Sequence, residues 1–142
     1  MKNKYLQDTK KKLAQYKMIK GMCEIRKKDI LNLQARVEYT EDELEKTRLE
    51  KEIKRLKIEL SENESTIFAI EKGFSYLTPS ALSIIQLKYI EKESWIAVGL
   101  RMGYGQSRCK EIGREALLVI GECLHGLIIH QDLPLIVGEG CY

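Results

Sequence analysis

The first 78 residues of the chain contain no proline and only two glycines, Gly21 and Gly73. Because proline and glycine are the residues that most disfavour a helix interior, this stretch is constrained to long helices. Within it, apolar residues recur at alternating intervals of four and three, and only Asn63 interrupts them; they are Leu49, Ile53, Leu56, Leu60, Ile67, Ile70 and Phe74. That spacing predicts the heptad seam of a coiled coil.

A looser apolar stripe precedes the seam and shifts register near Gly21; it comprises Leu6, Leu13, Tyr16, Ile19, Cys23, Ile30, Leu33 and Val37. Two arrangements fit, a single long coiled coil and an antiparallel helical hairpin. Thr40 and Glu43 have the spacing of a capping box, and acidic residues cluster in the same turn, as at a helix N-terminus. We therefore expect a turn at 38–40 that joins two helices of about 30 residues each, within a region 1–74.

We expect region 1–74 to serve oligomerisation. The seam offers more apolar surface than one hairpin can bury, so a partner subunit should cover the rest and form a homodimer or higher homo-oligomer. Asn63 either fixes the register or oligomeric state, or lies at the edge of the stripe and faces water. Residues 1–28 are also rich in basic side chains, which form either an arm that contacts nucleic-acid phosphate or an acidic partner, or a solvated helix face; they are Lys2, Lys4, Lys10, Lys11, Lys12, Lys17, Lys20, Arg26, Lys27 and Lys28.

A different pattern occupies residues 87–117. Two short apolar stripes, each with residues three and four apart, flank the glycine-rich stretch Met102-Gly103-Tyr104-Gly105; they are Trp95, Val98 and Met102, then Cys109, Ile112, Ala116 and Leu117. Gly103 can adopt the positive φ that a sharp turn between helices needs. The pattern predicts a helix-turn-helix domain over 77–126, whose second helix presents a polar face to the DNA major groove.

The motifs of this segment resemble those of the C-terminal domain of ArpU/RinA-type phage transcription regulators, and they are similar to region 4 of bacterial sigma factors. The resemblance covers about residues 77–120 and rests on Leu87-Lys88-Tyr89-Ile90, Ser94-Trp95, Met102-Gly103-Tyr104-Gly105 and Ala116-Leu117. Val98-Gly99 stands where the family usually has Ile-Ala, and Gly105 stands where it usually has Ser or Thr. The resemblance implies a phage or prophage activator of late genes that acts at a promoter and contacts bacterial RNA polymerase.

The second helix of the motif is the predicted DNA-reading element. Cys109, Ile112, Ala116 and Leu117 should point inward, which leaves Gln106, Ser107, Arg108, Lys110, Glu111 and Arg114 on the outer faces. Near the start of the helix, Arg108 is suited to guanine and Gln106 to adenine. Lys110 and Arg114 are better suited to phosphates, and Glu111 either accepts from a cytosine amine or is a solvated carboxylate. Trp95, Tyr89 and Tyr104 should act as packing anchors.

The sequence gives no indication of an enzyme, a metal site or a cofactor. It contains neither a P-loop nor a G-x-G-x-x-G motif, and its two histidines have no evident nucleophile partner. The spacing of Cys123, His125, His130 and Cys141 fits no zinc pattern, and the scattered cysteines indicate free thiols in a reducing compartment. No apolar run approaches the ~20 residues of a membrane helix, so we expect a cytoplasmic protein with no membrane partner.

Taken together, these patterns predict an all-α protein with a long N-terminal helical hairpin or coiled coil and a small helix-turn-helix domain. Residues 127–142 form an apolar tail of unknown role. The predicted function is sequence-specific binding of double-stranded DNA in transcription regulation. The alternatives are a small terminase subunit that recognises packaging DNA, favoured by a ring-shaped oligomer, and a coiled-coil adaptor that does not bind DNA, favoured by the absence of salt-sensitive duplex binding.

Overall fold

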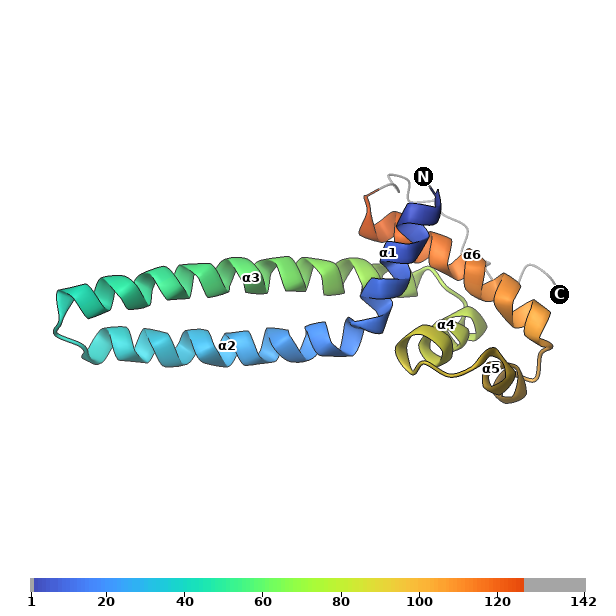
Figure 1. Cartoon of the computed structure of the whole chain (residues 1–142), viewed down its shortest axis with the longest axis horizontal. Helices are drawn as coiled ribbons and strands as arrows, with labels where there is room; N and C mark the ends of the chain where they lie inside the picture. Colours follow the sequence, from blue (N-terminus) through green and yellow to red (C-terminus); the bar gives the residue numbers. More distant parts are fainter. Residues whose placement is uncertain (1, 127–142) are drawn as a thin grey trace. The chain divides into compact units, whose positions relative to one another are not determined.

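The computed structural model describes residues 2–126, which form six α-helices and one π-helical turn (Figure 1). The predicted all-α fold is therefore confirmed. Contacts divide the chain into two compact units. We call Lys17–Ile67 the hairpin unit, and residues 2–16 together with 68–126 the helix-turn-helix unit. The predicted tail, residues 127–142, lies outside the described residues.

The hairpin unit contains most of α2 (Tyr16–Tyr39) and of α3 (Glu43–Ser75), which run side by side in opposite directions (Figure 1). Of the two predicted arrangements, the antiparallel hairpin is therefore the one that forms. Its core contains Ile30 from α2 and Ile53 and Leu56 from α3, all buried, with Leu33, Val37 and Leu60 packed against them. Burial of these apolar side chains between the two helices is the main stabilising contribution in this unit.

The turn of the hairpin lies slightly later than predicted. The helix α3 begins at Glu43, and the Asp42 carboxylate accepts hydrogen bonds from the backbone N–H groups of Leu44 at 3.0 Å and Glu45 at 3.4 Å. Asp42 is thus the N-cap, and the predicted capping box of Thr40 with Glu43 is wrong. Aspartate serves this position well because its short side chain reaches the first free N–H groups and its charge suits the helix N-terminus.

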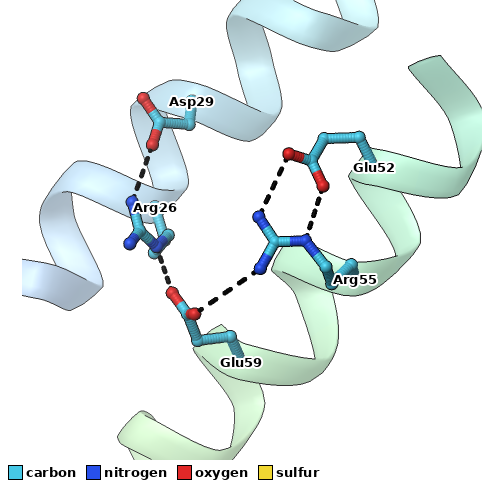
Figure 2. Close-up of polar contacts among 5 residues, drawn as sticks. All are labelled: Arg26, Asp29, Glu52, Arg55 and Glu59. Carbon is cyan, nitrogen blue, oxygen red and sulfur yellow. Dashed lines mark hydrogen bonds and ion pairs between the residues drawn. The ribbon is translucent and has the colours of Figure 1, made fainter. Parts of the chain in front are cut away.

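Charged side chains also join the two helices of the hairpin (Figure 2). Arg26 of α2 donates to Glu59 of α3 and, at 3.0 Å, to Asp29 of its own helix. Arg55 donates to both carboxylate oxygens of Glu52, at 2.6 and 3.0 Å, and lies 4.0 Å from Glu59. The hydrogen bond from Arg55 holds the pKa of Glu52 below its ordinary value.

The first predicted helix is in fact two helices. The helix α1 spans Lys2–Ala14 and α2 begins at Tyr16, so a break that was not predicted falls near Gln15, ahead of the register shift expected near Gly21. Residues up to Tyr16 belong to the helix-turn-helix unit, where Leu13 is fully buried. The heptad seam is likewise divided. Its first part packs in the hairpin, whereas Ile70 and Phe74 contribute to the core of the helix-turn-helix unit.

The helix-turn-helix unit continues through α4 (Pro79–Ile85), η1 (Gln86–Ile90), α5 (Trp95–Met102) and α6 (Gln106–Leu124). Thr78 caps α4 by accepting from the backbone N–H of Ala81 at 3.2 Å, and Pro79 occupies the first turn, where its missing N–H costs nothing. The common core of these helices is apolar, and its fully buried residues include Leu13, Ile70, Ile84, Ile85, Val98, Ile112 and Ile120.

The helix α1 completes this unit by packing on the C-terminal half of α6. Thr9 is fully buried, and a Cβ atom added at Gly121 would lie 2.7 Å from its Oγ1. At the end of α6, His125 lies 2.9 Å from Asp8 through Nε2 and 2.7 Å from the Gly121 carbonyl through Nδ1, and its ring contacts Tyr5.

In the part of the chain that the structure describes, no helix is both long and apolar enough to cross a membrane.

Candidate nucleic-acid interface

The helix-turn-helix geometry is set by three residues between and before α5 and α6. Ser94 caps α5 by accepting from the backbone N–H of Ala97 at 3.1 Å. Gly103 ends α5 in the left-handed region at φ +75°, and its N–H donates to the carbonyl of Gly99 at 2.9 Å. The predicted positive φ at Gly103 is therefore confirmed. Gly105 occupies the N-cap of α6, where it offers no side-chain oxygen to the first N–H groups.

One face of α6 is buried in the core, as its apolar spacing predicts. Cys109, Ile112, Ala116 and Leu117 are all buried. Burial raises the pKa of the Cys109 thiol, which therefore behaves as a small apolar side chain. Trp95 of α5 is half-buried and packs on Gly113, where an added Cβ would lie 3.0 Å from its ring. This burial fixes the orientation of α6, so its opposite face must point outward.

The outer face of α6 carries the six predicted DNA-binding residues on its first turns. Gln106, Ser107, Lys110, Glu111 and Arg114 are exposed, whereas Arg108 is only half-exposed. Lys110 and Arg114 lie four residues apart, so they share one side of the helix. The structure thus brings all six side chains to the same end of one helix, immediately after the turn. A helix whose N-terminal turns are polar and exposed can be inserted into a groove.

Arg108 and Glu111 form an ion pair on this face. The Nη1 atom of Arg108 lies 2.5 Å from Oε1 of Glu111, three residues further along α6. The Arg108 side chain is 30% exposed and that of Glu111 is 60% exposed. In the free protein, then, the side chain that is best suited to read guanine is already engaged with a carboxylate. The sequence pattern assigned Arg108 and Glu111 separate roles and did not predict that the two side chains form an ion pair.

Several further side chains hold α5 and the following turn in place through contacts that the sequence did not predict. The ammonium of Lys88 lies 5.1 Å from the centre of the Trp95 ring and donates to the carbonyl of Glu93 at 3.2 Å. Arg101 pairs with Glu93 at 3.4 Å, which connects α5 to the loop that precedes it. The Tyr104 hydroxyl lies 3.4 Å from Ser80 Oγ, so the turn is fixed to α4. These contacts join residues distant in sequence or in a loop, where periodicity gives no signal.

The aromatic anchors and the thiols agree with their predicted roles. Tyr89 packs edge-on to Trp95 with ring centres 6.2 Å apart, and burial raises the pKa of its hydroxyl. Cys23, Cys109 and Cys123 are free thiols, and Cys141 lies outside the described residues. Among the residues that the structure describes, no group of three or more His, Cys, Asp or Glu side chains is placed to hold a metal ion. Of the four residues whose spacing fits no zinc pattern, Cys123 and His125 are described by the structure, and His130, like Cys141, lies outside the described residues.

Net charge differs between the two units. The hairpin unit carries twelve basic and twelve acidic residues, so its net charge is zero. The described part of the helix-turn-helix unit carries twelve basic and seven acidic residues. Five of the ten basic residues in 1–28 belong to this second unit; they are Lys2, Lys4, Lys10, Lys11 and Lys12. Excess positive charge thus accompanies the exposed face of α6.

Comparison of the chain with models of protein families, with curated proteins and with solved structures gives no match.

Proposed function

We propose that this protein binds double-stranded DNA sequence-specifically, with the N-terminal half of α6 in the major groove. One observation carries the proposal: the first turns of α6 expose Gln106, Ser107, Lys110, Glu111 and Arg114 directly after a left-handed glycine turn, while the opposite face is buried. Burial of that face leaves these side chains as the outer surface of the second helix of a helix-turn-helix. Such a helix enters the major groove with its N-terminal residues at the base edges.

The residue types on this face suit both parts of DNA recognition. Arg108 and Gln106 have the donor and acceptor groups that pair with guanine and adenine. Lys110, Arg114 and the Ser107 hydroxyl suit phosphate oxygens, which orient the protein without reading sequence. The free N–H groups at the start of α6 favour an anion there. The net positive charge of the unit favours association with a polyanion.

The biological role that best fits these features is transcription regulation. The resemblance of residues 77–120 to ArpU/RinA-type phage regulators implies control of late genes at a promoter and contact with bacterial RNA polymerase. The long hairpin, neutral in net charge, suits contact with protein better than contact with DNA.

We infer that the hairpin unit pairs with a second copy of the chain. Large apolar side chains remain exposed on it, including Met18, Ile25, Leu31 and Ile58 at 50% or more, and burial by a partner would remove them from water. Met18 and Ile25 lie seven residues apart on one side of α2. Leu56 and Leu60, by contrast, pack in the hairpin itself, so Leu56→Asp and Leu60→Asp would disrupt the fold and not only the oligomer.

Sedimentation of a Met18→Gln, Ile25→Gln variant tests this pairing. The double variant should sediment as a smaller species than the wild-type chain, with an unchanged helical spectrum. An unchanged size would place the interface elsewhere. A wild-type ring of many subunits would instead favour a small terminase.

Selection from a pool of random duplexes tests the DNA-binding function itself. The full chain should enrich one sequence, and its affinity for that duplex should fall steeply as salt rises from about 50 to 200 mM. If no duplex is retained at the lower salt concentration, the proposal is wrong and the adaptor function is favoured.

A further inference from the structure

We propose that Glu111 is a specificity-determining residue, which holds Arg108 in the free protein and disfavours binding to DNA that lacks the correct base. This inference rests on the proposed DNA-binding function and deepens it. In the free protein, Arg108 Nη1 lies 2.5 Å from Glu111 Oε1. The two residues are three apart on α6, in the segment that is proposed to enter the major groove.

The two partners of this ion pair differ in their exposure to solvent. Arg108 is the one residue of the six that is only half-exposed, and its side chain is 30% accessible. Glu111 is 60% accessible and faces outward with Ser107, Lys110 and Arg114. An approaching DNA strand therefore meets a carboxylate beside the cations. The negative charge of Glu111 repels phosphates, and its carboxylate also engages the Nη1 atom of Arg108, which a phosphate could otherwise contact.

When the protein binds DNA, the contacts that can replace the Arg108–Glu111 ion pair differ between correct and incorrect sequences. A guanine offers Arg108 two acceptors, O6 and N7, to which its guanidinium can donate at the same time. A nearby cytosine offers the released Glu111 an N4 amine donor. When both bases are present, Arg108 exchanges its contact with Glu111 for hydrogen bonds to guanine, and Glu111 exchanges its contact with Arg108 for a hydrogen bond from cytosine. With other bases, the ion pair either stays closed, so that Arg108 makes no base contact, or opens and leaves Glu111 as an unpaired negative charge close to DNA. The pair therefore lowers non-specific affinity more than specific affinity.

The test compares Glu111→Gln with Glu115→Gln in the full chain. Glu115 is an exposed carboxylate one turn further along α6, so its replacement removes the same charge from the same helix. It lies seven residues from Arg108, about 10.5 Å along the helix axis, too far for the same ion pair. The probes are the duplex recovered by selection and a scrambled duplex of the same length and composition. Melting temperatures confirm that both variants are folded.

We expect Glu111→Gln to tighten binding to the scrambled duplex by roughly two- to fivefold more than Glu115→Gln does. The ratio of selected to scrambled affinity should fall by at least that factor. In an Arg108→Ala background, the extra effect of Glu111→Gln should be smaller, because the ion pair is already absent and only the repulsion between Glu111 and phosphates is relieved.

Two results would overturn the inference while leaving the DNA-binding function intact. One is an equal change in scrambled-duplex affinity for Glu111→Gln and Glu115→Gln. The other is an undiminished effect of Glu111→Gln in the Arg108→Ala background. If the wild-type chain binds neither duplex in a salt-dependent way, the proposed function itself fails, and this inference fails with it.

Discussion

Individual glycines determine how closely α6 is approached by its neighbours. An added Cβ at Gly121 would lie 2.7 Å from Thr9 Oγ1 of α1, and one at Gly113 would lie 3.0 Å from the Trp95 ring of α5. A Cβ at Gly73 of α3 would lie 3.0 Å from the backbone of Ile120. These distances are shorter than ordinary van der Waals contact. Each pair of helices can therefore approach this closely only because the residue at the contact is a glycine, which has no Cβ atom.

Gly121→Ala should destabilise the helix-turn-helix unit. The new methyl group overlaps the Thr9 hydroxyl, which is fully buried and donates to the Tyr5 carbonyl at 2.7 Å, so α1 must shift. Overpacking of this kind costs about 1–3 kcal/mol. Thermal unfolding followed by circular dichroism measures the loss, and adding Thr9→Ala to Gly121→Ala should recover part of it.

Gly21→Ala is the matched control. Gly21 lies inside α2 and an added Cβ there meets nothing within 4 Å, so alanine should stabilise the helix by about 0.5–1 kcal/mol. If Gly121→Ala instead raised the melting temperature as much as Gly21→Ala does, the close packing of α1 on α6 would be wrong.

At the scale of elements, the turn between α5 and α6 can be tested at its two glycines. Gly105 has φ −67° and ψ 156°, which serine adopts readily, and an added Cβ there meets nothing within 4 Å. Gly105→Ser should supply the missing N-cap oxygen and stabilise the protein by about 0.5–1 kcal/mol. Chemical denaturation of the variant measures the change in the free energy of unfolding.

Gly103→Ser, two residues earlier, should have the opposite effect. Gly103 is in the left-handed region at φ +75°, where a serine side chain is strained by about 1 kcal/mol. Open space surrounds both glycines, so no steric clash distinguishes the two substitutions. Equal effects of the two serines would contradict the assigned turn.

The hairpin has its own test, through the ion pairs in Figure 2. The hydrogen bond from Arg55 lowers the pKa of Glu52 in the folded protein. The contribution of this contact to folding stability is therefore fully present at pH values above 4.5, the ordinary pKa of a glutamate. It is lost as the pH falls through the lowered pKa, when the carboxylate is protonated. In urea at low salt, the wild-type unfolding midpoint should therefore fall more steeply below about pH 4.5 than that of Glu52→Gln.

Glu50→Gln provides the control for this pH dependence, since Glu50 is an exposed carboxylate on the same helix. Its unfolding midpoint should follow the wild-type curve. If Glu52→Gln and Glu50→Gln gave the same profile, the Arg55–Glu52 contact would contribute nothing measurable.

At the scale of the whole molecule, local patterns predicted the elements but not all of their partners. The three- and four-residue spacing on α6 correctly separated the buried Cys109 and Ile112 from the exposed Lys110 and Arg114, because burial on a helix follows its period. Gly103 was predictable because its φ is a local requirement. The hairpin was predictable because acidic residues mark the start of α3.

The remaining features depend on contacts between distant residues. The break near Gln15 contains neither proline nor glycine, so no local pattern marks it, and Leu13 and Thr9 just before it are buried against other helices of their unit. The division of the heptad seam has the same origin, since Ile70 fits the spacing of a coiled coil equally well but is buried in a different core. The Arg108–Glu111 pair is local, yet the sequence also permits each side chain to be solvated separately.

The most direct test of the central claim, that the outer face of α6 contacts DNA, is the salt dependence of duplex binding by charge variants. Lys110→Ala and Arg114→Ala should each reduce the slope of log affinity against log salt by about one, for the selected and the scrambled duplex alike. Lys54→Ala and Lys57→Ala remove exposed lysines from the hairpin unit and should leave the slope unchanged. If the two α6 variants kept the wild-type slope while remaining folded, α6 would not be the DNA-contacting helix, and the basic residues of α1 would become the next surface to test.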